Sequence, residues 1–376
     1  MSNVFEIQPK WNDSKKYLWL MGVLLTGVPI NALILNAITD YNIFLWFGPI
    51  VILFIAPTLD LILGEDESNP PESAVKTLER DSYYIKAIYL SAIGLFVGFI
   101  ASAYFISSQE ISWISYLGLS LTVGTSSGVS INTAHELGHK KSVVAQWMAK
   151  LTLAPVGYGH FFVEHNRGHH VRVATHEDPA TSRYGENFWS FLPRSIFGGI
   201  KSAIALENRR LKALNLPKFS LQNEVIHSWL MSLFLWGGLV AFFGIKIIPF
   251  LLIQSVFGIS LLEAINYVEH YGLQREKLNS GQYEACKPIH SWNSNSLNSN
   301  IFLYQLQRHS DHHAHPTRSY QSLRHFASSP QLPAGYGTML LLACIPPLWF
   351  KIMNPRVDAF YKNSAAQEQK TFKVVS

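Results

Sequence analysis

Six apolar runs of about twenty residues each constrain what this chain can fold into more than any other feature. A helix rises about 1.5 Å per residue, so about 20 apolar residues are enough to cross a hydrocarbon core about 30 Å thick. The runs are residues 17–38, 41–63, 84–106, 111–133, 229–245 and 247–268. They predict an all-α, polytopic membrane protein built as a helical bundle of about six spans.

The balance of charged and apolar residues agrees with this prediction. Only 15% of the residues are charged and 48% are hydrophobic, whereas soluble domains carry about a quarter charged residues. The first run follows a polar start, MSNVFEIQPKWNDSKK, without a small-residue cleavage site, and it is too long for a signal-peptide core. We therefore expect a retained span there and not a removed leader.

The runs divide the chain into four parts. Residues 1–133 hold the N-terminal tail and spans one to four, residues 134–228 a long polar segment, residues 229–268 spans five and six, and residues 269–376 a polar tail. Only a short turn near Gly244 separates spans five and six, so they are predicted to form a helical hairpin. A further apolar stretch, residues 336–350, is short and broken by two prolines. We expect a membrane-surface or packed segment there and not a seventh span.

Basic residues are distributed unevenly between the two sides of the predicted bundle. The short connections at residues 39–40, 107–113 and 244–246 hold one basic residue, Lys246. The opposite side holds two long segments rich in Lys and Arg, together with Lys10, Lys15, Lys16, Lys76, Arg80, Lys140 and Lys141. Because basic connections stay in the cytoplasm, both termini and both long segments are predicted to be cytoplasmic. The net charge of +5 follows from this asymmetry, and no nucleic-acid partner is expected.

Histidine is the residue type whose distribution indicates chemistry. The chain has fifteen histidines, and none falls in the first four apolar runs. Nine occur where spans end, in the strings NTAHELGHKK, EHNRGHHVR, VEHYG and RHSDHHAH. They are His135, His139, His165, His169, His170, His270, His309, His312 and His313. This clustering at predicted membrane–cytoplasm boundaries predicts a metal site, since residues spaced i, i+4 share one helical face.

Nine imidazoles are more than one ion can use. Imidazole nitrogen binds Fe, Zn and Cu, and one ion rarely takes more than about four of them from a protein. The set therefore predicts two metals with about four to five imidazoles each. Carboxylates can balance the resulting positive charge by accepting hydrogen bonds from the free ring N–H groups. The first candidates are Glu164, Glu269 and Asp311, with Glu136, Glu177 and Asp178 also near the boxes.

The last box contains a fourth histidine, which helical geometry separates from the other three. At about 3.6 residues per turn, His309, His312 and His313 fall within an arc of roughly 100°, and His315 lies roughly 60° outside it. His315 also precedes Pro316, which disfavours helical geometry there. It is therefore predicted to be a bystander. The same interpretation, a surface or hydrogen-bonded histidine, is given to His160, His176, His227, His290 and His325.

Other kinds of site have little support in the sequence. The two cysteines, Cys286 and Cys344, lie far apart and form no Cys-x-x-Cys knuckle. No serine sits in a Gly-x-Ser-x-Gly context, and no phosphate-binding glycine-rich loop occurs. A histidine-rich metal transporter would place its ligands at mid-bilayer in broken spans, whereas these histidines lie at the ends of spans.

The histidine boxes resemble those of a known superfamily. Boxes of the form H-x3-H, H-x3-HH and H-x2-HH around paired spans are similar to those of the membrane fatty-acid desaturases and hydroxylases. The flanking residues NTAHELGHKK, EHNRGHHVRVATHEDPATSRYGE, LLEAINYVEHYGLQR and LQRHSDHHAHPTRSYQSLR look like four signature segments of bacterial integral-membrane alkane 1-monooxygenases. The resemblance covers the architecture from the first span to the last box.

The resemblance implies a chemistry and a set of partners. It implies two iron ions in a non-haem di-iron centre that inserts one oxygen atom of O2 into the terminal methyl group of a medium-chain n-alkane taken from the lipid. The family's nine iron-ligating histidines carry over onto the nine that spacing selects. A bacterial inner (cytoplasmic) membrane is implied, with a separate rubredoxin and its reductase as electron donor, because two cysteines exclude a fused rubredoxin. No protein acid or base is assigned, and the sequence does not identify the residues of the substrate channel.

Two other activities stay open at this point. An aromatic methyl monooxygenase of the xylene type shares the boxes and a similar His-Tyr-Gly segment, and a fatty-acyl desaturase shares the boxes. The basic segment ENRRLKALNLPK, residues 207–218, is predicted to meet either an acidic electron donor or lipid headgroups.

Overall fold

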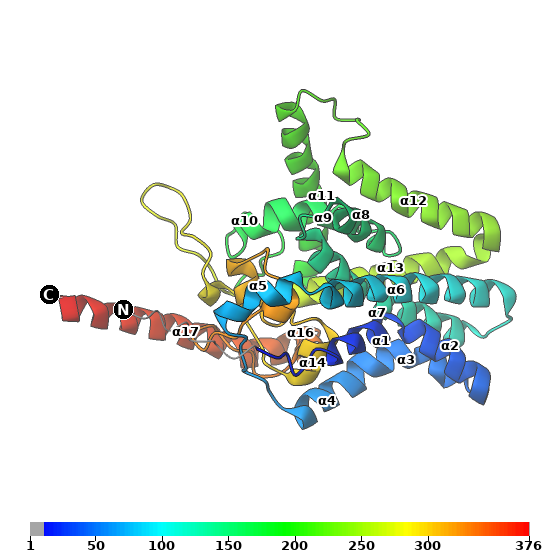
Figure 1. Ribbon diagram of the computed structural model, residues 1–376, viewed down its shortest axis with the longest axis horizontal. Coiled ribbons are helices and arrows are strands. Elements are labelled where there is room, and N and C mark those ends of the chain that lie inside the picture. The colour runs from blue at the N-terminus through cyan, green and yellow to red at the C-terminus, as the bar shows by residue number, and fades with distance from the viewer. Residues whose placement is uncertain (1–10, 376) are drawn as a thin grey trace, which may run out of the picture.

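The computed structural model describes residues 11–375, with side chains described as far as residue 363, so Lys10 lies outside the described residues. The fold is helical (Figure 1). The α-helices are α1 (Met21–Thr26), α2 (Val28–Thr39), α3 (Phe47–Ile50), α4 (Ala56–Leu63), α5 (Glu72–Arg80), α6 (Ser82–Ser108), α7 (Trp113–Gly138), α8 (Val143–Thr152), α9 (Phe161–Glu164), α10 (His170–Arg172), α11 (Phe188–Ala213), α12 (Glu224–Phe243), α13 (Ile248–His270), α14 (Leu297–Phe302), α15 (His309–Ala314), α16 (Tyr336–Ala343) and α17 (Pro346–Val375). Single π-helical turns lie at Val51–Ile55 and His165–His169. The described part of the chain has isolated β-bridges but no β-strand, which confirms the all-α class.

Four helical stretches are long and apolar enough to cross a membrane, and there are up to six if each of two bent helix pairs makes one span. The four are Asn42–Leu63, Ser82–Ser108, Glu224–Phe243 and Ile245–His270. They correspond to predicted spans two, three, five and six. Span five begins earlier than predicted because the Asn223 side chain caps α12, accepting hydrogen bonds from the backbone N–H groups of Val225 and Ile226.

The first predicted span is bent. Its two halves, Leu18–Thr26 and Val28–Thr39, meet at an angle of 69° around Gly27. Pro29 lies in the first turn of the second half and has no N–H to continue the hydrogen-bond ladder of the first, which accounts for the break. The stretch at residues 336–350 bends even more, by 120° between α16 and α17. It packs against the protein through Tyr336 and Met339.

The fourth predicted span lies in α7, which is not among these candidate spans and forms the buried centre of the bundle. Of its 26 residues, 20 are buried. Since protein surrounds this helix, it can carry small polar residues where a lipid-facing helix needs apolar ones. The Ser127 hydroxyl, for example, donates to Gln254 Oε1 on α13 at 2.7 Å. A Cβ at Gly124 would lie 2.8 Å from the Gln254 carbonyl oxygen, so glycine is required for this close approach.

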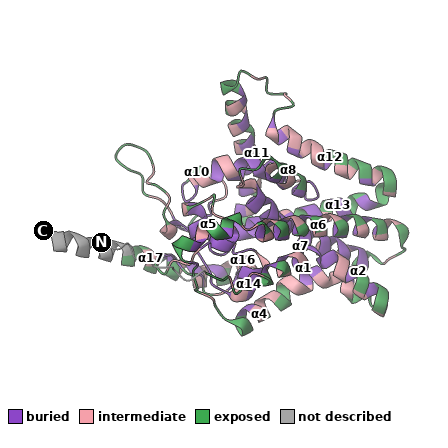
Figure 2. Cartoon of the chain, viewed as in Figure 1, coloured by how far each residue is buried: buried purple, intermediate pink, exposed green. Residues whose placement is uncertain are grey.

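The turn between α12 and α13 occurs at Gly244, with φ of +79°, as the sequence predicts. The two helices then diverge (Figure 1), and α12 packs against α8 and α11. Trp236 Nε1 on α12 donates to the Pro155 carbonyl oxygen at 3.1 Å. Figure 2 shows that buried residues concentrate along α7 and α13, whereas α12 and the outer parts of α2 and α4 are mostly half-buried or exposed.

Candidate metal centre

Four segments bring the nine predicted histidines together. His135 lies in the last turn of α7, and His139 directly follows that helix. His270 is the last residue of α13. The remaining six come from the stretch around α10 and from α15, which are His165, His169, His170, His309, His312 and His313.

A π-helical turn lets the second box reach both halves of the site. The turn covers His165–His169, and a π turn changes the direction in which the following side chains point. His165 and His170 consequently meet, with their Nε2 atoms 3.0 Å apart. His169 instead points to His313, with an Nε2–Nε2 distance of 3.2 Å.

The nine imidazoles form two groups, and within each group one ring nitrogen per residue lies within 4.8 Å of all the others. The five-imidazole group contains His135, His139, His165, His170 and His312. The four-imidazole group contains His169, His270, His309 and His313. The last box therefore divides between the two groups. The rings of His170 and His313 connect them, with centroids 4.6 Å apart.

The spacing of the nitrogens fits a metal ion in each group. The Nε2 atoms of His135 and His312 lie 2.8 Å apart, as do those of His309 and His313. Two nitrogens bound about 2.1 Å from one ion at right angles lie roughly 3.0 Å apart. While the Nε2 atoms converge, the Nδ1 atoms of His170 and His270 are buried without a partner among the described residues. Both groups could hold a metal ion.

Burial keeps these imidazoles in the form that binds metals. It lowers the pKa of five of them well below the ordinary value for histidine: His165, His170, His309, His312 and His313. Burial, with the positive charge of Lys140 nearby, lowers the pKa of His139 to about 3. Neutral imidazole is the metal-binding form, so these rings need lose no proton before they bind an ion near pH 7.

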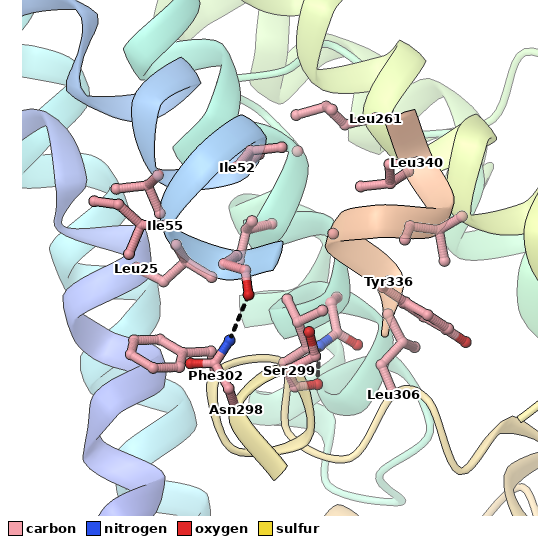
Figure 3. A pocket seen from close by; sticks show the side chains of 18 of the residues that line it. Leu25, Ile52, Ile55, Leu261, Asn298, Ser299, Phe302, Leu306, Tyr336 and Leu340 are labelled. Atoms are coloured by element: carbon pink, nitrogen blue, oxygen red, sulfur yellow. Dashed lines mark hydrogen bonds between the residues drawn. The ribbon is translucent and has the colours of Figure 1, made fainter. Parts of the chain in front are cut away.

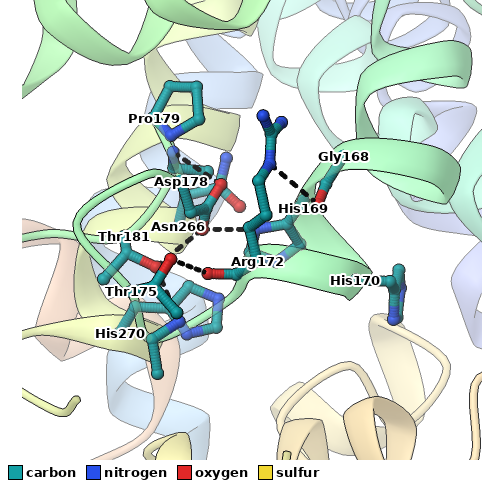
Figure 4. A network of polar contacts seen from close by, with 12 residues as sticks. Gly168, His169, His170, Arg172, Thr175, Asp178, Pro179, Thr181, Asn266 and His270 are labelled. Carbon is teal, nitrogen blue, oxygen red and sulfur yellow. Dashed lines mark hydrogen bonds and ion pairs between the residues drawn. The ribbon is translucent and has the colours of Figure 1, made fainter. Parts of the chain in front are cut away.

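Two carboxylates contact the four-imidazole group. Asp178 Oδ2 accepts a hydrogen bond from His169 Nδ1 at 2.9 Å and another from the Thr181 hydroxyl at 2.6 Å (Figure 4). Such an acceptor fixes the orientation of a metal-binding imidazole. Glu269 Oε2 lies 3.2 Å from His309 Nε2, and its Oε1 accepts a hydrogen bond from the Tyr336 hydroxyl at 2.6 Å. Nothing in the string HEDPA distinguishes Asp178 from its neighbour Glu177, so sequence reasoning could not rank it first.

Glu164 and Asp311, the other two of the three first candidates, pair with residues outside the two imidazole groups. Glu164 accepts from Arg172 Nη2 at 2.8 Å, and burial raises its pKa to about 7. Asp311 accepts from the backbone N–H of Arg324 at 2.9 Å and from His315 Nδ1 at 2.8 Å. The side chain of His315 is 46% exposed and belongs to neither imidazole group.

The remaining histidines lie outside both groups. His290 and His325 are hydrogen-bonded, to the backbone N–H of Lys287 and to Asn295. His227 stacks on Trp147, and His176 is exposed. His160 differs from the interpretation given above, because it is buried against Tyr158 and its Nδ1 has no partner among the described residues. Burial lowers the pKa of His160 to about 4.

An apolar cavity of about 110 Å³ lies between α4, α7, α13, α14 and α16 (Figure 3). Its wall includes Leu25, Ile52, Ile55, Val129, Leu261 and Leu340. Asn132 and Leu306, which lie three residues before His135 and His309, also line it. Tyr336 lines the cavity too and connects it to Glu269. The sequence offers no signal for Tyr336, because it resembles any packed aromatic residue at the start of an apolar stretch.

Comparison with known proteins gives consistent matches. Residues 111–342 match the fatty acid desaturase family. Alkane 1-monooxygenase 1 of Alcanivorax borkumensis is 49% identical over 347 residues, which are 92% of this chain and 85% of that protein. An alkane 1-monooxygenase of Acinetobacter baylyi is 45% identical over 353 residues, 93% and 86% of the two chains. The hydroxylase component of the xylene/toluene monooxygenase of Pseudomonas putida is 27% identical over 241 residues, 63% of each chain.

Proposed function

The chain belongs to the alkane 1-monooxygenases of the fatty acid desaturase family, and we propose that it converts medium-chain n-alkanes to 1-alkanols at a non-haem di-iron centre. Membership makes it an alkane monooxygenase, which uses an alkane, O2 and an electron donor. The observation that carries the proposal is the pair of buried imidazole groups together with an apolar cavity, which Tyr336 links through Glu269 to His309.

We assign one iron ion to the five-imidazole group and one to the four-imidazole group. When bound, the irons would supply the reduction and cleavage of O2 and the removal of hydrogen from the alkane. The chain's own residues hold and orient this centre. Asp178 fixes the ring of His169, and the Tyr336 hydroxyl holds the Glu269 carboxylate beside His309.

The cavity would position the substrate. An n-alkane has no polar group to bind, so its orientation depends on the shape of an apolar wall and on exclusion of water. The π-helical turn Val51–Ile55 contributes Val51, Ile52 and Ile55 to this wall. A chain that enters between Ile52 and Leu261 would bring its terminal methyl group to the end lined by Leu306 and Tyr336, which Glu269 links to His309.

The proposal includes a location and an electron donor. We place the chain in a bacterial inner membrane, with its termini and its imidazole groups facing the cytoplasm, on the basis of the basic residues on that side. A separate rubredoxin, reduced by its reductase, would supply two electrons.

Metal analysis and product analysis together test the proposed function. The purified chain should hold about two irons, and octane, O2 and a rubredoxin system should yield 1-octanol. Purified protein with no bound iron would contradict the di-iron assignment. A benzylic alcohol from xylene with no 1-octanol would favour the xylene-type activity, which the match to the xylene/toluene monooxygenase component keeps as the second candidate. An alkenyl product from a fatty-acyl substrate would favour a desaturase.

A cavity variant tests the substrate position. Val129 lines the cavity, so Val129→Phe should fill part of it and shift the preference towards shorter alkanes. Val97→Phe is the matched control, because Val97 is 50% exposed on α6. Product yields would be compared over a ladder of alkane lengths. An unchanged chain-length profile in Val129→Phe would contradict this use of the cavity.

A further inference from the structure

The part of α11 from Phe197 onward and the connection to α12 form an arm, residues 197–223, whose far end projects from the body of the protein (Figure 1). Large apolar side chains are exposed along it. They are Phe197, Ile204, Leu214, Phe219 and Leu221. Phe219 is 93% exposed and Leu221 80% exposed. Exposed apolar side chains gathered on one element mark an interaction site, because water solvates them poorly.

Cationic side chains alternate with these apolar ones. The arm contains Lys201, Arg209, Arg210, Lys212 and Lys218 and a single acidic residue, Glu207. Glu207 is buried and binds Arg210 and Arg167. Arg209, Lys212 and Lys218 form no ion pair within the described residues, and all three line a concave surface at the end of α11. The exposed charge of the arm is therefore positive.

The arm ends at a membrane-spanning helix. Glu224 is the first residue of α12, and Lys150 Nζ holds its carboxylate at 2.9 Å. Arg167 binds the other carboxylate oxygen of Glu224. With this end fixed, Leu221 and Phe219 lie three and five residues before the span. Apolar side chains at this level enter the boundary between headgroups and acyl chains, and neighbouring cations meet lipid phosphates.

We propose that the arm binds anionic phospholipid headgroups, with Phe219 and Leu221 inserted into the interfacial layer and Arg209, Lys212 and Lys218 facing the phosphates. An acidic electron donor would satisfy the cations but leave the two apolar side chains without a partner. The base of the arm contacts the second histidine box, where Glu207 binds Arg167, but its far end, with residues 214–221, projects away from the body of the protein (Figure 1). Each cation near an anionic leaflet adds electrostatic attraction to that surface. The inference is independent of the reaction that the imidazole groups perform.

Spin labelling of the full chain in lipid nanodiscs tests this site. With Cys286 and Cys344 replaced by serine, Ser220→Cys carries the label between the two apolar side chains. Ser280→Cys, at an exposed loop position, carries the control label. We expect the label at residue 220 to be more accessible to O2 and less accessible to a water-soluble nickel complex than the label at residue 280. The difference should grow when phosphatidylglycerol is added to a zwitterionic nanodisc.

Two variants separate the roles of charge and insertion. Lys212→Glu with Lys218→Glu should abolish the effect of phosphatidylglycerol, and Phe219→Ser with Leu221→Ser should make residue 220 as water-accessible as residue 280. Retained alkane hydroxylation in both variants would show that they are folded. Equal water accessibility at residues 220 and 280 in the parent protein, in both lipid compositions, would overturn the proposal. So would a label that responds to inorganic phosphate, or to an acidic rubredoxin, but not to lipid.

Discussion

The two imidazole groups differ in their number of nitrogen donors, in their burial and in the carboxylates that contact their rings. All four histidines of the four-imidazole group are buried, whereas His139 and His170 of the five-imidazole group are partly exposed. The four-imidazole group has Asp178 and Glu269 against its rings and reaches the cavity through Tyr336. The comparison indicates two ways to build a metal site. The five-imidazole group has an additional nitrogen donor, whereas the four-imidazole group has fewer donors and a carboxylate against two of its rings, those of His169 and His309.

Loss of one donor from the four-imidazole group should have the largest effect. His309→Ala leaves three imidazoles, so we expect loss of about one metal ion per chain and of 1-octanol formation. His315→Ala should retain both, because this side chain belongs to neither group. Metal analysis and product chromatography would measure the two variants in parallel. Equal losses in both would show that His315 is not a bystander.

Loss of one donor from the five-imidazole group should cost less. His139→Ala leaves four imidazoles in that group, as many as the other group has in the native chain. We expect a metal content close to that of the native chain and a smaller loss of turnover than in His309→Ala. Equal loss of metal from His139→Ala and His309→Ala would show that the number of nitrogen donors does not distinguish the two groups.

Removal of the carboxylate that orients His169 should lower metal affinity without removing a nitrogen donor. Asp178→Asn keeps the shape of the side chain but weakens the hydrogen bond to His169, so metal affinity should fall about 10–100-fold. Glu177→Gln is the control, because Glu177 is the adjacent, exposed carboxylate. Metal dissociation measured by competition with a chelator would compare them. An unchanged affinity in Asp178→Asn would show that orientation of His169 does not depend on this contact.

The smallest expected effect is on the free energy of unfolding, and it comes from His160, an imidazole that is buried outside the two metal groups. His160 is 2% exposed but lies outside both groups, and its pKa is lowered to about 4. Between about pH 6.5 and pH 4 the unfolded chain takes up a proton that the folded chain does not, so the free energy of unfolding falls as pH falls. The slope from one such residue is at most about 1.4 kcal/mol per pH unit.

His160→Gln in the metal-free protein tests this effect. Its free energy of unfolding, measured by titration with sodium dodecyl sulfate in mixed micelles, should decrease less on acidification than that of the parent chain. His227→Gln, in which a partly exposed histidine is replaced, provides the comparison. Identical slopes for His160→Gln and the parent would mean that His160 contributes nothing to the acid sensitivity.

Much of the fold could be predicted because lipid restricts the possible structures. Four of the six apolar runs are straightforward spans, since only a helix satisfies the backbone in a membrane. The bend at Gly27 and the burial of α7 depend on packing against other helices, which a run of apolar residues does not encode. The cavity is a further example, because Val129, Ile52 and Leu340 come from three distant segments.

The nine clustered histidines could be predicted because their spacing is local. Their division into groups of five and four could not, since it depends on where four segments meet. The π-helical turn at His165–His169 is part of the reason. In an ordinary α-helix the side chains of His169 and His170 would point in other directions relative to His165. No residue in the string EHNRGHH indicates that the turn contains an additional residue.

The π-helical turn at His165–His169 makes the site sensitive to the number of residues in this stretch. Deletion of Gly168 would restore an ordinary helical turn and rotate His169 and His170 by about 100° relative to His165. Because His169 serves one group and His170 the other, a single deletion would dismantle both together. Most helix ends in a protein tolerate a change of one residue in length. Here the number of residues from His165 to His170 matters to both groups, in addition to the identity of the histidines themselves.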